Sequence, residues 1–123
     1  MDLTQAECLI HTILGPTHRK IRPFAACIDR VEELLFVQKV HMEDIRFMRD
    51  VYPVVAERMH QNTSSLTRLV ERLANDCWRQ MRRKNLVETY IGSNPLDPPY
   101  PAELTCYLAC YLHLGRPFSQ AIL

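Results

Sequence analysis

Apolar residues recur at steps of three and four along most of the chain, which is the spacing of amphipathic helices. The clearest example runs from Ser64 to about Arg83 and has a single apolar stripe that a helix would bury. The stripe comprises Leu66, Leu69, Val70, Leu73, Cys77 and Met81. No segment alternates apolar and polar residues as a half-buried strand does. The pattern therefore predicts an all-α protein.

Cap residues place the first predicted helix, and apolar periodicity places the second and third. Thr4 and Glu7 have the spacing of a capping box, so the first helix should follow them and end at Gly15–Pro16. A second helix is predicted from about Pro23 to Val40, and a third begins near Met42.

Prolines place the remaining helices. Pro53 cannot donate a hydrogen bond inside a helix, so it should stand in the first turn of a new helix that carries Ala56. A short helix from Leu86 to Ile91 and a last helix from Pro101 to Leu114 are separated by a proline-rich loop.

Residues 52–78 have the order of a helix-turn-helix: a short apolar helix, a polar break and a long amphipathic helix. His60 to Thr63 form the predicted break, and His60 stands where many such motifs use glycine for a positive φ. The outer face of the long helix carries groups spaced to meet base edges and phosphates. They are Ser64, Ser65, Arg68, Arg72, Asn75 and Arg79. Any two packed antiparallel helices show a similar stripe, so plain helical packing is the competing interpretation.

The net charge of the 123 residues is +1, which is low for a nucleic-acid-binding protein. The basic residues are nevertheless clustered, at His18–Arg22 and at Arg79–Lys84. Each cluster would suit a phosphate backbone, but cations also favour helix C-termini because of the helix dipole. The charge pattern therefore leaves both DNA binding and solvated helix ends open.

The five cysteines are an odd number and no signal peptide precedes them, which predicts reduced thiols in a cytoplasm. Cys106 and Cys110 would share one helix face, but no CxxC pair completes a metal site, so no metal is expected. Cys8, Cys27 and Cys77 fall in apolar stripes, where free cysteine packs as a small hydrophobe. All five thiols are therefore predicted to be inert.

Length and composition predict one globular domain over residues 1–123, with 47% hydrophobic and 24% charged residues. No run of about 18 apolar residues is present, so no membrane span is predicted. The five histidines are scattered, and no Gly-rich phosphate loop, HExxH or GxSxG motif occurs. The sequence therefore predicts neither an enzyme nor a cofactor.

Several segments together resemble one known family. Residues 8–15 (CLIHTILG) match its first helix, and residues 16–20 (PTHRK) resemble its Pro-x-His-x-Lys turn. Residues 52–59 (YPVVAERM) resemble its Tyr-Pro-x-Ile-Ala-Lys-Lys-Phe helix, residues 62–78 span its turn and recognition helix, and residues 99–104 (PYPAEL) match the start of its last helix. In order and spacing, the chain resembles the C-terminal effector domain of the sporulation initiation response regulator (the stage-zero sporulation protein A family) of spore-forming bacteria.

This resemblance implies about six helices, DNA binding through the helix-turn-helix, paired copies on repeated sites and contact with RNA polymerase. Ser64 and Arg68 match a serine and an arginine of the family's recognition helix. Ser65, Thr67 and Glu71 depart from it, because the family usually has an arginine, a glutamate and a basic residue there. The family's DNA sequence is therefore not assumed. The receiver domain with its phosphorylated aspartate has no counterpart in the 123 residues, so we expect either a stand-alone relative or a piece excised from a longer regulator, and Met1 fits the former.

We therefore predict a sequence-specific DNA-binding transcriptional regulator, related to sporulation initiation and lacking a receiver domain. The residues predicted to face base edges are Ser64, Ser65, Thr67 and Arg68. The residues predicted to hold phosphates are Arg72, Arg79, and His18, Arg19 and Lys20 in the turn that ends at Arg22. The alternative is a protein-interaction module of the same fold, which pairs with a full-length regulator or RNA polymerase. The low net charge and Ser65 favour this alternative.

The last helix also predicts a homodimer, because it is apolar on most sides. Its apolar residues are Leu104, Cys106, Tyr107, Leu108, Ala109, Cys110, Tyr111 and Leu112. Such a helix must be covered on most sides, and a symmetric dimer is the simplest closed cover. The alternative is that the tail, Phe118 to Leu123, folds back over it.

Overall fold

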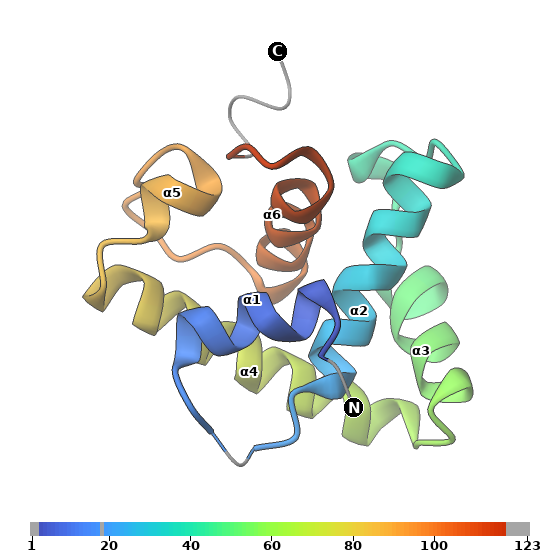
Figure 1. The fold of residues 1–123 in the computed structure, drawn as a ribbon. Coiled ribbons are helices and arrows are strands. Elements are labelled where there is room, and N and C mark those ends of the chain that lie inside the picture. Colours follow the sequence, from blue (N-terminus) through green and yellow to red (C-terminus); the bar gives the residue numbers. More distant parts are fainter. Residues whose placement is uncertain (1–2, 18, 118–123) are drawn as a thin grey trace.

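The computed structural model describes residues 3–17 and 19–117, which form six α-helices and no strand (Figure 1). The helices are α1 (Gln5–Leu14), α2 (Arg22–Glu32), α3 (Tyr52–Arg58), α4 (Thr63–Arg83), α5 (Val87–Ile91) and α6 (Pro101–Leu114). The all-α prediction is confirmed. No helix in the described part of the chain is long and apolar enough to cross a membrane.

The predicted caps hold most of these helices at their ends. The Glu7 backbone N–H donates to the Thr4 hydroxyl oxygen (3.1 Å), and that hydroxyl donates to the Glu7 carboxylate (3.3 Å). At the other end of the chain, Gly92 and Gly115 follow α5 and α6 in the left-handed conformation, with φ of 89° and 67°. The boundaries predicted for α1, α5 and α6 therefore agree closely with the structure.

The chain between α2 and α3 differs from the prediction. The second helix was expected to reach Val40, but α2 gives way to a π-helical segment, η1 (Glu33–Val37), and Lys39 has a φ of 61°. The predicted third helix is wrong: a single 3-10 turn, η2 (Met42–Asp44), and a π-helical segment, η3 (Phe47–Val51), replace it. Pro53 lacks the N–H that a continuous α-helix would need, and the Tyr52 N–H bonds to the Phe47 oxygen in the wider π register instead.

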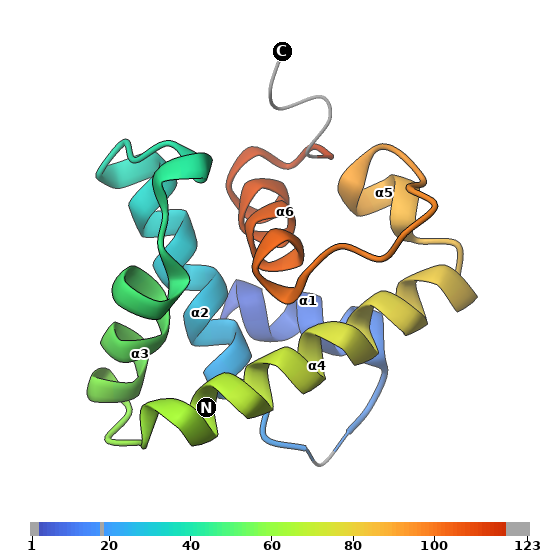
Figure 2. The same cartoon turned by 180° about the vertical axis from the view of Figure 1, so that it is seen from behind.

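Helix α6 lies at the centre of the fold, between α2 and α5, with α4 running across its end (Figures 1 and 2). Leu104, Thr105, Leu108 and Ala109 are buried. Near its C-terminus, the His113 ring stacks on Phe36 with centroids 3.9 Å apart. Three helices of the same chain therefore cover the apolar sides of α6, and its composition alone no longer requires a second copy. The tail 118–123 lies outside the described residues.

Candidate nucleic-acid interface

Helices α3 and α4 are joined by a tight turn at Met59–Asn62. His60 has a φ of 55°, so the position predicted to favour glycine does adopt the left-handed conformation. The His60 N–H bonds to the Glu57 oxygen (3.2 Å) and the Gln61 N–H to the Ala56 oxygen (2.9 Å), which is the hydrogen-bond pattern of a Schellman motif. Asn62 then caps α4, because its side-chain oxygen accepts the Ser65 N–H (3.1 Å). The turn therefore fixes where α4 begins.

The apolar stripe seats α4 on the rest of the domain. Leu66, Val70, Leu73, Cys77 and Met81 are buried as predicted, and Leu69 is half-buried. On α3, Val55 and Ala56 are buried where α3 and α4 are in contact. The side chain of Ala56 is small enough for two helices to pack closely. The same contacts are compatible with plain helical packing, so the motif's role remains a prediction.

The exposed side of α4 is an arginine face. Five exposed arginines belong to it: Arg68, Arg72, Arg79, Arg82 and Arg83. At about 100° per residue they fall within an arc of roughly 100°, and at 1.5 Å per residue they extend over about 22 Å. Glu71 is exposed at the margin of this arc. The domain therefore presents a concentrated positive stripe despite a net charge of only +1.

The predicted base-facing residues do not all share this face. Ser64, Ser65 and Arg68 are exposed within or beside the arc. Thr67 is half-buried about 100° away from Arg68, and its hydroxyl donates to the Thr63 carbonyl oxygen (2.8 Å). Its helix position therefore sets Thr67 apart from the other three.

The predicted phosphate-holding loop lies beside α4, as Figures 1 and 2 both show. We call residues 15–21 the basic loop. Arg19 and Lys20 are exposed in it, whereas His18 lies outside the described residues. The Arg19 Nη1 atom is 2.5 Å from the Asp76 Oδ2 atom, and Arg79 pairs with the Oδ1 atom of the same carboxylate. Sequence reasoning missed Asp76, because 57 residues separate it from Arg19.

Arg79 has an acidic partner, and in this it differs from Arg68 and Arg72. Within the described part of the chain, no acidic side chain forms an ion pair with Arg68 or Arg72. Arg82 and Arg83 belong to the same face, although the sequence pattern indicates them only as members of the basic cluster Arg79–Lys84 and not as predicted DNA-binding residues. Asn62 was also missed as a cap, although an asparagine directly before a helical pattern is an ordinary start signal.

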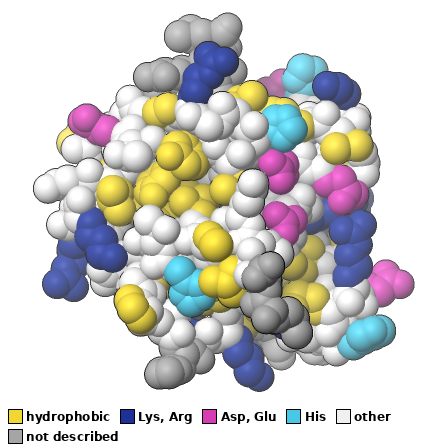
Figure 3. All heavy atoms as spheres, in the orientation of Figure 1, with side chains coloured by type: hydrophobic (Ala, Val, Ile, Leu, Met, Phe, Trp, Pro, Cys, Tyr) yellow, Lys and Arg dark blue, Asp and Glu magenta, His cyan; other side chains and the backbone are white. Residues whose placement is uncertain are grey.

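Acidic side chains gather elsewhere, over α2 in the view of Figure 3. There, weakened hydration of the carboxylate together with the charges of Glu32 and Glu7 raises the pKa of Asp29 to about 6, although this residue is exposed at the surface. Hydrophobic side chains also reach the surface between α5 and α6 (Figure 3). Acidic side chains thus lie over α2, where they alternate with arginines such as Arg30, whereas the exposed arc of α4 is mostly basic.

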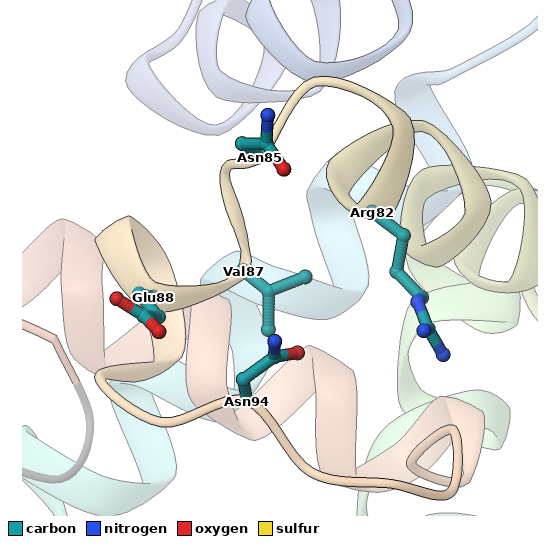
Figure 4. Close-up of a pocket in the computed structure, with 5 residues that line it drawn as sticks. All are labelled: Arg82, Asn85, Val87, Glu88 and Asn94. Carbon is teal, nitrogen blue, oxygen red and sulfur yellow. The ribbon is translucent and has the colours of Figure 1, made fainter.

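A separate hollow of about 300 Å³ lies where α4 meets α5 (Figure 4). Its lining residues are Arg82, Asn85, Val87, Glu88 and Asn94. In Figure 4, Asn85 and Asn94 lie on opposite sides of Val87. The lining thus offers two amides, one carboxylate and one guanidinium. Elsewhere in the described residues, no three His, Cys, Asp or Glu side chains come together as metal ligands.

The cysteines divide into two groups. Burial raises the pKa of Cys27, Cys77 and Cys106 to about 12 and that of Cys110 to about 11, so these four stay protonated. Cys8 is exposed, and its assignment to a buried stripe is wrong. Position 8 lies on the outer side of α1, since Ala6, Leu9, Ile10 and Ile13 supply the buried side.

Comparison of the chain with protein-family models, curated proteins and solved structures gives no significant match. The resemblance to the sporulation regulator family therefore rests on the quoted segments alone.

Proposed function

We propose that the protein is a transcription regulator that binds duplex DNA with the arginine face of α4 and the basic loop. The exposed arginine face is the observation that carries this proposal. The exposed arc holds five guanidiniums, and one carboxylate lies at each margin of it: Glu71, which is exposed, and Asp76, which is mostly buried and pairs with Arg79. Arginine is the residue best suited to phosphates and to the guanine edge, because its donors form a planar fork.

The order of the exposed residues along α4 supports placing this helix in the major groove. The major groove, about 12 Å wide, admits one α-helix. Ser64, Ser65 and Arg68 lie in the first turns of α4, where a recognition helix contacts base edges. Arg72 and Arg79, farther along, and Arg19 and Lys20 on the basic loop would then contact phosphates on either side of the groove. These four cations contact at most four phosphates, so the salt slope should be no steeper than about −4 in log–log terms.

The resemblance adds the biological setting to this proposal: control of sporulation in a bacterial cytoplasm, with paired copies and contact with RNA polymerase. The competing function is a protein-interaction module of the same fold. Glu71 favours it, since its exposed carboxylate beside the arginine face would repel phosphates.

Fluorescence anisotropy with labelled genomic fragments tests the proposal, at low salt and again at about 0.2 M salt. Replacing both Arg68 and Arg72 by alanine should abolish most of the binding. Arg116→Ala is a control for the loss of an exposed arginine elsewhere, because Arg116 follows the C-terminal end of α6, whereas α4 crosses the opposite end of that helix (Figure 1). If the wild type binds no fragment at low salt, the interaction module becomes the better interpretation.

A further inference from the structure

A hollow of about 280 Å³ lies between the basic loop and α4. Its lining residues are Leu14, Pro16, Thr17, Arg19, Asp76, Arg79 and Gln80. Two segments far apart in the sequence thus bring two guanidiniums and one carboxylate to the same opening.

The three charged groups are layered. The Asp76 side chain is only 18% exposed, whereas Arg19 and Arg79 are 40% and 69% exposed. Each arginine takes a different oxygen of the carboxylate, so one acid holds both. The Arg19 N–H also donates to the Thr17 hydroxyl (3.1 Å), which orders the loop at this point. Asp76 therefore lies beneath two arginines that face the solvent.

This arrangement determines what the pair can bind. Two guanidiniums repel each other, and a shared carboxylate offsets that repulsion so that they stand together. A guanidinium has five N–H donors, and one bond to Asp76 leaves most of them available. A phosphodiester carries one negative charge on two free oxygens, which suits donors from two neighbouring guanidiniums.

We propose that Arg19 and Arg79, held side by side by Asp76, form a binding site for one backbone phosphate of DNA. This rests on the proposed function and adds a positioning residue to it. The proposal predicts an effect on DNA binding that is opposite to the one expected from net charge. Asp76→Asn makes the protein more positive, yet it should weaken DNA binding because the two arginines separate.

The site itself is tested without DNA, by following the arginine Nε–H resonances of the full chain in NMR. Inorganic phosphate should shift the resonances of Arg19 and Arg79 together in the wild type. The shifts should be much smaller in Asp76→Asn and largely kept in Asp76→Glu, which retains the carboxylate. Equal shifts in wild type and Asp76→Asn would overturn the positioning role.

The DNA assignment is tested with a random-sequence duplex and a matched charge control. Glu71→Gln removes an exposed carboxylate on the same helix that makes no hydrogen bond or ion pair with the other described residues, so it should tighten binding. Asp76→Asn should instead raise Kd about tenfold, the order of one charge-assisted contact, and reduce the salt slope by about 0.9. If Asp76→Asn tightens binding as Glu71→Gln does, Asp76 only neutralises charge and the proposal fails. If the wild type binds no duplex, the proposed function falls, and the assignment of the site to DNA falls with it.

Discussion

Replacing His60 by glycine should stabilise the protein, because His60 is held at a φ of 55° in the turn before α4. The left-handed conformation costs a residue with a Cβ atom about 1–2 kcal/mol. Glycine has greater conformational freedom in the unfolded chain, and this reduces the gain in the free energy of unfolding by about 0.5–1 kcal/mol. The net gain is therefore about 0.5–1 kcal/mol, or roughly 2–4 °C in Tm for a domain of this size.

The control for this prediction is Asn85, which has a φ of 57° in an equivalent motif after α4. Asparagine tolerates the left-handed region better than histidine, so Asn85→Gly should gain less than His60→Gly. Urea unfolding measures both, provided the m-value is unchanged. A His60→Gly variant no more stable than the wild type would refute the argument from backbone strain.

Other outcomes follow from the same structure. Arg68→Ala should cost about 1–3 kcal/mol of DNA affinity and relax preference at one base pair, whereas Arg79→Ala should weaken all sequences alike; equal losses on specific and random duplexes would place Arg68 on the backbone. The raised pKa of Asp29 makes its ionisation unfavourable in the folded state, so stability should fall as the pH rises from about 4 to about 6. Asp29→Asn should remove that pH dependence and raise the free energy of unfolding at pH 7 by about 1 kcal/mol. This value is smaller than the full pKa shift would give, because solvent screens an exposed residue. Urea unfolding at several pH values measures it. A thiol reagent should label Cys8 rapidly in the native protein and the four buried cysteines only on unfolding, measured by mass spectrometry. Sedimentation at about 0.1 mM should give a monomer if α6 is fully covered by its own chain.

Local signals predicted most helix boundaries because they act over a few residues. Thr4, Gly92 and Pro101 each mark a helix end through a cap or a missing N–H, and the structure places helix ends at all three. The segment 33–51 was not predictable in this way. The π turn at Phe47–Val51 comes just before Pro53, and its Asp50 oxygen accepts a tertiary bond from the Arg30 Nε–H (2.9 Å), which hydrophobic periodicity does not report.

The candidate site was likewise predictable only where local helical spacing determines it. Helical spacing alone was enough to place Ser64, Ser65 and Arg68 on an exposed face, and the same spacing should have set Thr67 apart. The Arg19–Asp76 pair depends on how the basic loop packs on α4, so only the structure reveals it. The burial of α6 is likewise a tertiary property, since composition shows that a helix needs cover but not what covers it.

Chemical-shift mapping of the isotope-labelled protein with a duplex that it binds tests the central claim most directly. The account predicts that the amide shifts gather on residues 63–72 and on the basic loop, with smaller changes toward Arg83. It also predicts little change on α2, where the acidic side chains lie. Shifts centred on α2, or on the surface between α5 and α6, would contradict the claim that α4 binds DNA.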